Sequence, residues 1–280
     1  MIQFSPCKIN LGLSILEKRA DSFHALETVF YPLALQDIVE IVPEKLNHKG
    51  KTNSINGVSF THTGIAIPGD ASNNLCVKAY HLLKADYPQI TALKIHLHKN
   101  IPMGAGLGGG SADGSTVLLM LNDLFKLNLS KTQLIKYAAH LGSDCPFFIL
   151  NEACHARGRG EILDPISIDL SNYTIALIHP GIHIATAWAF QQLNPCIKEK
   201  IIAEIIKQPI ETWKAELIND FEAPVFKAHP PLEAFKNYLY EQGAIYASMS
   251  GSGSSLFGIF PKGTKIEPPV SESSIRVDLV

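Results

Sequence analysis

The glycine-rich stretch at residues 101–116 constrains this chain more than any other feature of its sequence. Five glycines fall within residues 104–110, and an apolar run with helical spacing, residues 117–125, follows them. Glycine lets a loop expose several backbone N–H groups without side chains in the way, and the N-terminus of a helix adds roughly half a positive charge. We therefore predict that this loop, with the helix behind it, holds a phosphate group.

Other glycine loops of known chemistry fit less well. Gly104, Gly106 and Gly109 match the letters of the dinucleotide fingerprint. That site needs an acidic residue about 20 positions later, at the end of a strand, whereas the nearest one, Asp123, lies inside the predicted helix. The loop does not close with the Gly-Lys-Ser/Thr of a P-loop, and the His-Arg-Asp and Asp-Phe-Gly signatures of a protein kinase are missing. A flexible linker would not stand between a strand and a long apolar helix.

Composition bounds the class of protein. The chain has 280 residues, 46% of them apolar, which is enough for one large or two ordinary domains. Its net charge is −2 and its basic residues form no cluster, so we expect neither nucleic acid nor an anionic membrane surface as a partner. There is no signal-peptide pattern, and no apolar run reaches about 18 residues. We expect a soluble, cytoplasmic protein.

Cysteine and histidine spacing indicates no metal site. The five cysteines are odd in number and contain no Cys-x-x-Cys pair, which favours buried thiols over disulfides or zinc. His179 and His183 are four apart, but Pro180-Gly181 would break a helix that placed both on one face.

Local patterns predict the elements of the first half. Residues 4–16 read as a strand with Lys8 and Asn10 on one face, a pattern that also fits a solvated face. Asn74 caps an amphipathic helix, and 93–99 reads as a strand that alternates apolar and polar residues. The remaining predictions are a polar loop over 18–30, a strand over 33–42, hairpins and loops over 44–70, and a helix opened by a capping box at Ser130 and Gln133 and ended by Gly142.

The second half reads as helices followed by a pair of strands. The predicted elements are a strand over 173–179, helices over 186–193, 197–207, 211–226 and 232–242, strands around 245 and 256–260, and a loose tail or short strand up to residue 280. Gly251 and Gly253 lie between the last two apolar strands, where they also fit a plain hairpin turn.

The loop Pro102-Met-Gly-Ala-Gly-Leu-Gly-Gly-Gly-Ser111 resembles the second motif of the GHMP kinase superfamily, Pro-x-Gly-x-Gly-Leu-Gly-x-x-Ser. With its extra glycine, the loop most resembles that of the members that phosphorylate a cytidine-diphosphate methylerythritol in the non-mevalonate isoprenoid pathway. The resemblance implies that the loop binds ATP, that Asn74 contacts the adenine and that Lys99 lies near the nucleotide. The loop residues concerned are Pro102, Met103, Gly104, Ala105, Gly106, Leu107, Gly108, Gly109, Gly110, Ser111 and Ala112.

The acceptor site is implied by three further likenesses to the same members. Lys8-Ile-Asn10 matches the first motif, so Lys8 and Asn10 would face the phosphoacceptor. Residues 19–26 resemble Arg-x-Asp-Gly-Tyr-His-x-Leu, which implies that Phe23 and His24 hold the cytosine. Because Phe23 replaces tyrosine, only its stacking role carries over. Phe190 aligns with another aromatic on the cytosine, with core packing as the alternative.

Two later segments complete the resemblance. The segment around Asp144 is similar to Gly-Ala-Asp-Val-Pro, which implies a catalytic base, although an aspartate near a proline is also an ordinary turn former. Gly251, Ser252 and Gly253 match the third motif, a loop that closes on the phosphates and substrate. Residues 155–161 resemble the hinge between the two domains.

The resemblance implies an α+β fold of two domains, residues 1–155 with a ribosomal-S5-like fold and residues 156–280 with a ferredoxin-like fold, and an active-site cleft between them. ATP would be the donor and Mg²⁺ would come with it, within reach of Ser111. Asp144 would take the proton of the attacking hydroxyl, and Lys8 would keep that carboxylate ionised. We expect a monomer or homodimer. Two alternatives stay open: a mevalonate- or sugar-type kinase of the superfamily, and a non-catalytic nucleotide-binding protein.

Overall fold

The computed structural model describes residues 1–21, 23–44, 57–193, 195–196, 198 and 200–267, and the backbone of 276–279. Unit 1 comprises Met1–Cys7, Ala34–Met103 and Gly108–Asn151, and unit 2 comprises Lys8–Leu33, Gly104–Leu107 and Glu152–Val280. Each unit is thus assembled from several segments of the chain. The two long strands β1 (Ile2–Lys18) and β2 (His24–Pro43) supply residues to both. A domain boundary between residues 155 and 156 stays a prediction.

The sheet of unit 1 contains a parallel strand that the sequence did not indicate. β4 (Leu93–Lys99) pairs antiparallel with the second half of β2, as a local pattern can suggest. On its other side it pairs parallel with β3 (Val58–Gly64), within the region predicted as hairpins and loops. Parallel strands need a long crossover, here through α1, so neighbouring residues carry no sign of the pairing. Most of the rest of that region, 45–56, lies outside the described residues.

The helices of unit 1 begin and end close to where their capping residues predict. Asn74 caps α1 by accepting a hydrogen bond from the Cys76 backbone, and the predicted capping box between Ser130 and Gln133 is present at α3. The helical elements are η1 (Ala71–Asn73), α1 (Leu75–Asp86), α2 (Gly109–Leu124), α3 (Lys131–Leu141) and α4 (Cys145–Leu150).

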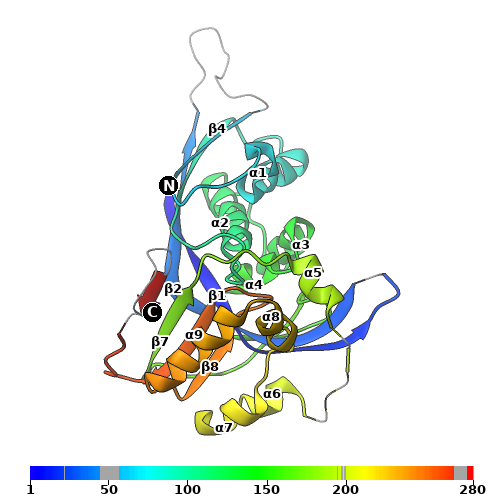
Figure 1. The fold of residues 1–280 in the computed structure, drawn as a ribbon. Coiled ribbons are helices and arrows are strands. Elements are labelled where there is room, and N and C mark those ends of the chain that lie inside the picture. Colours follow the sequence, from blue (N-terminus) through cyan, green and yellow to red (C-terminus); the bar gives the residue numbers. More distant parts are fainter. Residues whose placement is uncertain are drawn as a thin grey trace. The chain divides into compact units, whose positions relative to one another are not determined.

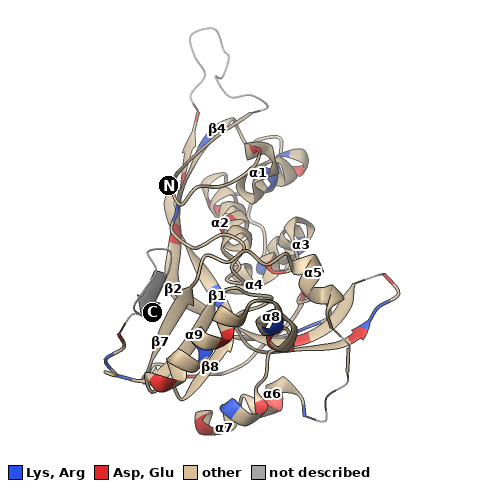
Figure 2. Cartoon of the chain, in the orientation of Figure 1, with Lys and Arg blue, Asp and Glu red and all other residues tan. Residues whose placement is uncertain are grey.

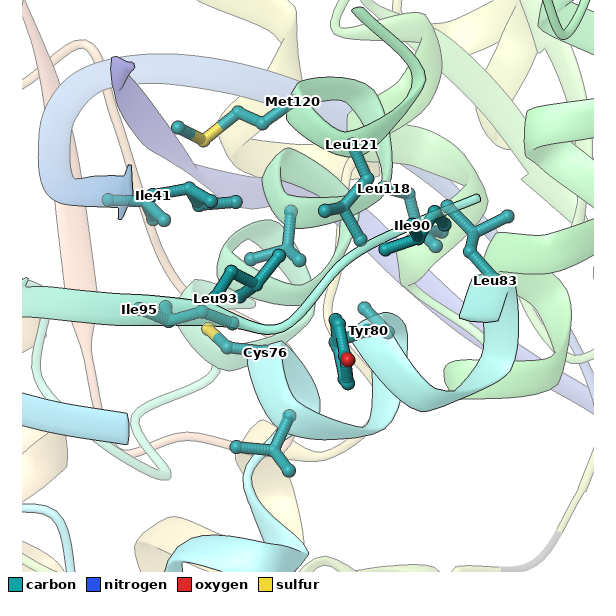
Figure 3. Close-up of a cluster of buried hydrophobic side chains, with 14 of the residues drawn as sticks. Ile41, Cys76, Tyr80, Leu83, Ile90, Leu93, Ile95, Leu118, Met120 and Leu121 are labelled. Atoms are coloured by element: carbon teal, nitrogen blue, oxygen red, sulfur yellow. The ribbon is translucent and has the colours of Figure 1, made fainter. Parts of the chain in front are cut away.

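The core of unit 1 lies between the sheet and helices α1 and α2 (Figure 3), and buried residues of α3 and α4 also belong to it. Strand residues such as Leu93 and Ile95 meet Tyr80 and Leu83 of α1 and Leu121 of α2. These side chains are at most 1% exposed, so the apolar contact anchors α2, whose first turn carries the glycine loop, to the strand that leads into it.

Unit 2 contains an antiparallel sheet covered by helices. Its strand order is β10-β7-β9-β8, with strands β7 (Tyr173–His179), β8 (Tyr246–Met249), β9 (Leu256–Pro261) and β10 (Arg276–Leu279). α8 (Glu222–Ala228) and α9 (Pro230–Glu241) pack with this sheet (Figure 1). The smaller elements are β5 (Cys154–Arg157), β6 (Ile162–Pro165), α5 (Thr186–Gln191), α6 (Ile202–Ile205) and α7 (Ile210–Glu216).

The single helix predicted over 211–226 is wrong. α7 ends at Glu216 and α8 begins at Glu222, because the residues between them bond to β1 instead of continuing the helix. Leu13 donates its N–H to the Ile218 carbonyl at 2.9 Å and accepts from the Asp220 N–H at 2.8 Å. The helix predicted over 197–207 is also shorter, since α6 covers only 202–205 and residues 197 and 199 lie outside the described part.

Three expectations from composition can be compared with the fold. Acidic and basic residues are intermixed along the helices (Figure 2), and no helix in the described part of the chain is long and apolar enough to cross a membrane. All five cysteines are thiols; four are buried as predicted, but Cys196 is exposed.

Candidate active site

The glycine loop leads into helix α2 earlier than the apolar run suggested. The helix begins at Gly109 rather than near residue 117, with Gly108 at its N-cap in a left-handed conformation (φ 71°). Its first i to i−4 hydrogen bond runs from the Ala112 N–H to the Gly108 carbonyl, at 2.9 Å. The N–H groups of Gly109, Gly110 and Ser111 therefore have no partner within the helix. Three adjacent donors at the positive end of a 16-residue helix suit a phosphate.

A cavity of about 440 Å³ lies beside this helix start in unit 1. Three residues of the predicted nucleotide site, Asn74, Met103 and Gly110, line it. Asn74 also performs the capping role that was its alternative, so its contact with a base stays a prediction. The lining residues are Phe60, His62, Ile67, Pro68, Gly69, Asp70, Ala71, Asn73, Asn74, Leu75, Leu97, Met103, Gly110 and Asp113.

Phe60 and His62 are lining residues that the sequence did not indicate. Their ring centroids are 6.3 Å apart with an interplanar angle of 27°, so they offer flat ring surfaces of the kind on which a nucleobase stacks. They lie on β3, which was not predicted, and the polar residues around them gave no signal of a site.

Lys99 lies in a buried ionic cluster rather than on an open surface. Its side chain is 0% exposed and forms ion pairs with Asp37 and, at 2.8 Å, with Asp113. Asp37 also accepts hydrogen bonds from the backbone N–H groups of Asn100 (2.5 Å) and Ile101 (2.8 Å). The cluster therefore joins the two ends of the glycine loop. Lys99 lies at the end of β4, just before the loop, and Asp113 lies in the second turn of α2, just after it. A direct contact between Lys99 and a nucleotide stays a prediction.

The cluster holds two carboxylates for one ammonium, and the pKa of Asp113 reflects this excess of negative charge. Burial raises the pKa of Asp113 to about 7; Lys99 acts against this rise and Asp37 adds to it. Burial acts to lower the pKa of Lys99, but Asp113 and Asp37 outweigh it and the pKa is raised. Asp113 Oδ1 and Ser5 Oγ are among the buried polar atoms of the described residues that have no hydrogen-bond partner, and Ser5 acts to lower the pKa of Asp113. Near neutral pH, Asp113 is thus close to gaining a proton.

We expect Asp113→Asn to flatten the dependence of stability on pH. Asp113 holds its proton up to about pH 7 when folded but only to near 3.8 when unfolded, so it stabilises the fold at low pH. This contribution falls as pH rises toward 7, by at most about 1.4 kcal/mol per pH unit. Urea unfolding at pH 5, 6, 7 and 8 should show a flatter curve for the variant. Asp123→Asn, an exposed change on the same helix, should run parallel to wild type, and parallel curves for Asp113→Asn would refute the assignment.

In unit 2, Lys8 and Asn10 share a face of β1, as strand alternation predicts, but that face is buried. Lys8 is 3% and Asn10 2% exposed, so the solvated-face alternative is wrong. Lys8 Nζ donates to Asn10 Oδ1 at 2.6 Å and to the Gly106 carbonyl at 3.0 Å, and it lies 5.0 Å from the centre of the Phe30 ring. A buried ammonium in contact with a phosphate-loop candidate is well placed to act on an anionic group.

The two predicted glycine loops meet in unit 2. Residues 250–255 connect β8 to β9, and Ser250 Oγ donates to the Gly106 carbonyl at 2.9 Å. Gly106 has φ +80°, and a Cβ atom there would lie 1.9 Å from the Ser250 carbonyl oxygen. Ser255 donates its N–H to the Ala105 carbonyl at 3.1 Å. The contact requires glycine at position 106. Residues 250–255 form the connection of a hairpin, as the alternative proposed, and they also contact the first glycine loop. Their closing on the phosphates and substrate stays a prediction.

Of the predicted cytosine residues, the structure brings His24 and Phe190 together. Their rings are stacked, with centroids 5.0 Å apart and an interplanar angle of 20°. Phe190 also meets Phe221 edge to face at 4.9 Å, so it takes part in the core as its alternative proposed. Phe23 is 52% exposed, and the Arg159 guanidinium lies 4.9 Å from its ring centre.

Asp144 and Ser111 lie in unit 1, at the starts of two helices. Asp144 is the N-cap residue of α4 but makes no capping hydrogen bond, so helix capping does not account for it. Ser115 Oγ of α2 donates to the Cys145 carbonyl at 2.8 Å, which fixes the backbone next to Asp144. Burial raises the pKa of the Cys145 thiol to about 11, against the effect of a hydrogen bond with Ser111. The Cys145 thiol therefore keeps its proton near neutral pH.

A glycine loop that opens a buried helix, with a second glycine loop between the two strands of an antiparallel hairpin, is the arrangement of a phosphotransferase of the GHMP kinase type. Two protein-family models match the chain. The family described as GHMP kinases N terminal domain matches residues 74–152, and the family described as GHMP kinases C terminal matches residues 201–268. Known mevalonate kinase structures share the fold; that from Methanococcus jannaschii has a TM-score of 0.70 at 14% identity, covering 100% of this chain and 97% of that one.

More similar relatives narrow the family. The 4-diphosphocytidyl-2-C-methyl-D-erythritol kinase of Cytophaga hutchinsonii is 48% identical, over 93% of this chain and 92% of its own length. That of Bacteroides thetaiotaomicron is 49% identical over 94% of both chains. A crystal structure of 4-(cytidine 5'-diphospho)-2C-methyl-D-erythritol kinase has a TM-score of 0.77 and 31% identity, covering 92% of this chain and 90% of that one. The chain belongs to this family of kinases within the GHMP kinases, which confirms the resemblance, the fold class and the expectation of a kinase.

Proposed function

We propose that the chain transfers the γ-phosphoryl group of ATP to the 2-hydroxyl of 4-diphosphocytidyl-2-C-methyl-D-erythritol, giving the 2-phosphate and ADP. The observation that carries the proposal is the contact of Lys8 with the glycine loop at Gly106, beside Asn10 and the loop of residues 250–255. A nucleotide sensor needs a phosphate loop but has no need of a buried lysine on it. The names of the relatives support the choice of acceptor.

The proposed division of labour follows from what phosphoryl transfer needs, namely alignment of two oxygens about phosphorus and neutralisation of charge. The N–H groups of Gly109, Gly110 and Ser111 would hold the donor's phosphates, and the base would enter the cavity beside Asn74. The oxygen of the 2-hydroxyl would bond to the γ-phosphorus while the bond from that phosphorus to ADP breaks. Asp144 would accept the proton that the hydroxyl loses. Lys8 would stabilise the charge that develops.

Mg²⁺ is part of the proposal. When bound with ATP it would neutralise charge on the phosphates, and it takes oxygen ligands while keeping several waters, so one or two protein groups suffice. The Ser111 hydroxyl at the start of α2 is of the right chemistry. The described residues contain no group of three His, Cys, Asp or Glu side chains that would hold a metal without substrate. We further propose that the enzyme acts in the cytoplasm as a monomer or homodimer.

Acceptor specificity tests the proposal. An ADP-release assay with ATP and several hydroxyl compounds should show activity with the cytidylylated methylerythritol. The bare methylerythritol phosphate should have a kcat/KM lower by about 10⁴-fold, because a site built to bind one base rejects an analogue that lacks it. Phe190→Leu should narrow this gap by slowing only the cytidylylated acceptor. Equal efficiency with both acceptors, or a preference for mevalonate or a sugar, would contradict the proposed function.

A further inference from the structure

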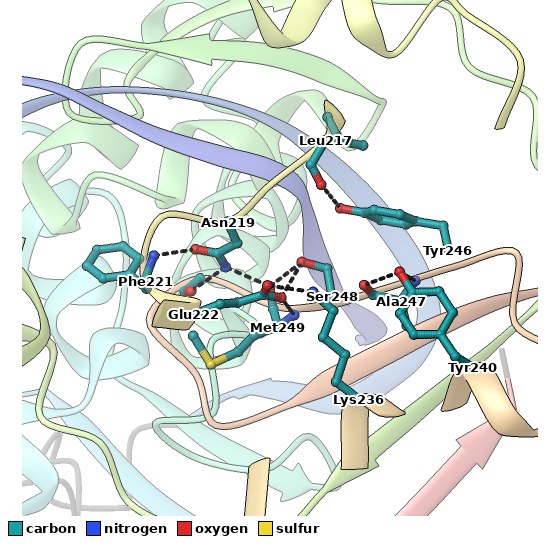
Figure 4. Close-up of polar contacts among 11 residues, drawn as sticks. Leu217, Asn219, Phe221, Glu222, Lys236, Tyr240, Tyr246, Ala247, Ser248 and Met249 are labelled. Atoms are coloured by element: carbon teal, nitrogen blue, oxygen red, sulfur yellow. Dashed lines mark hydrogen bonds and ion pairs between the residues drawn. The ribbon is translucent and has the colours of Figure 1, made fainter. Parts of the chain in front are cut away.

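The loop of residues 250–255 is held from behind by one buried asparagine. Asn219 is 1% exposed, and its amide nitrogen donates to the carbonyls of Met249 (2.7 Å) and Gly251 (2.8 Å), while its Oδ1 accepts the Phe221 N–H at 3.0 Å (Figure 4). Both amide hydrogens and the acceptor are therefore used. The two carbonyls lie on either side of Ser250, so this side chain sets the path of the loop where it begins.

A carboxylate three residues after Asn219 holds the end of β8, the strand before the loop. Glu222, 7% exposed, accepts hydrogen bonds from the Met249 N–H (2.8 Å) and Ser248 Oγ (2.9 Å), and it pairs with Lys236 Nζ at 2.6 Å (Figure 4). Met249 is thus gripped at its N–H by Glu222 and at its carbonyl by Asn219. The end of β8 has little freedom to shift relative to residues 219–222.

The segment that carries Asn219 is itself fixed to β1. Leu13 and Asn219 form an isolated parallel bridge, and the Ile15 N–H donates to Asp220 Oδ2 at 2.9 Å. β1 is the strand that presents Lys8 and Asn10. A backbone route of a few residues therefore leads from the proposed acceptor site, through Asn219, to the loop of residues 250–255.

The loop of residues 250–255 also contacts the glycine loop at Gly106. Ser250, between the two carbonyls held by Asn219, donates to the Gly106 carbonyl at 2.9 Å and contacts the Asn10 N–H at 3.3 Å. Lys8 Nζ donates to that same Gly106 carbonyl at 3.0 Å. Displacement of Ser250 would therefore change the position of the Gly106 carbonyl, which accepts a hydrogen bond from the Lys8 ammonium.

We propose that Asn219 is a positioning residue for phosphoryl transfer, holding the loop of residues 250–255 in register with Gly106 and Lys8. The inference rests on the proposed function and adds a residue that acts through the loop without touching substrate. Only an amide supplies two donors and one acceptor at this place: aspartate would set a carboxylate against two carbonyl oxygens, and alanine would leave both carbonyls unpaired.

The test compares Asn219→Asp with a control that costs a similar hydrogen bond but does not touch the loop. Tyr246→Phe removes a buried hydrogen bond from the Tyr246 hydroxyl to the Leu217 carbonyl, 2.9 Å long and in the same unit. Both variants should unfold at lower temperature than wild type. At a temperature well below both transitions, kcat per folded molecule should fall by about 10²-fold for Asn219→Asp, the usual effect of a misplacement of about 1 Å. KM for ATP should stay within about threefold, and Tyr246→Phe should keep the wild-type kcat.

A kcat of folded Asn219→Asp within about threefold of wild type, or a change confined to KM, would overturn the inference. If this variant does not accumulate in folded form, Asn219→Ala, which brings no charge to the two carbonyls, takes its place with the same criteria. The assay uses whichever acceptor of the panel the wild type turns over. A different acceptor would then contradict the proposed function, while the comparison of the variants would still decide the role of Asn219.

Discussion

Asp144→Asn is expected to lower kcat by about 10²- to 10⁴-fold, the usual contribution of a general base. Asparagine keeps the size of the side chain and most of its hydrogen-bonding geometry but cannot accept the proton of the attacking hydroxyl. The loss corresponds to roughly 3 to 5 kcal/mol in the barrier. ATP affinity should change little, because the N–H groups proposed to hold the phosphates lie at the start of α2 and are left intact.

Steady-state rates and ATP binding, measured on the same preparation, check this expectation. Asp123→Asn is the matched control, since it makes the same chemical change at an exposed position of α2 and should leave kcat unchanged. A kcat for Asp144→Asn within about threefold of wild type would remove Asp144 from the mechanism and leave it as a turn former.

A double-mutant cycle with Lys8 tests whether the two groups serve one step. Lys8→Ala should also lower kcat, and the double variant should be about as slow as the slower single one, since groups that act as a unit are not additive. Losses in kcat that multiply would mean that Lys8 and Asp144 act independently. A change confined to KM would assign Lys8 to substrate binding alone, a role its contacts with Asn10 and Gly106 also allow.

The parts of the fold that could be predicted from the sequence are those with local causes. The cap at Asn74, the capping box at Ser130 and the alternation in β4 each depend on residues within a few positions of one another. The break between α7 and α8 depends instead on β1, about 200 positions earlier, which the apolar spacing of 211–226 could not reveal. Asn219 and Glu222 lie in that break and at its edge, so the wrong helix prediction also concealed them.

The ionic cluster, by contrast, left a signal that period-two alternation can find. Asp37 is in phase with the buried Val39 and Ile41 of β2, and Lys99 is in phase with the buried Leu97 of β4. Opposite charges in the inward phase of two strands indicate a buried pair, because neither charge is stable there alone. The third member could not be found this way, since Asp113 was assigned to the loop before the predicted helix.

Lys99→Met is the change with the largest expected effect on stability. It removes the one ammonium from a site with two carboxylates, and breaking a buried pair in this way costs about 3 to 5 kcal/mol. Urea unfolding at pH 8, where Asp113 of the wild type is mostly ionised, should show the full loss, because the variant must bury both carboxylates without their counter-ion or protonate one of them. At pH 5 the loss should be smaller, because Asp113 then carries a proton and needs no counter-ion. Lys94→Met, on the exposed face of the same strand, should stay within about 0.5 kcal/mol of wild type.

A second change distinguishes loss of ion pairing from loss of packing. Methionine fills much of the volume of lysine, so most of the cost of Lys99→Met should come from the carboxylates left behind. Lys99→Met combined with Asp113→Asn should therefore be more stable at pH 8 than Lys99→Met alone, since Asp37 keeps the backbone N–H groups of Asn100 and Ile101 as donors. If the second change gives no recovery, or if Lys99→Met is nearly as stable as wild type at pH 8, the cluster does not hold the two ends of the glycine loop together by charge.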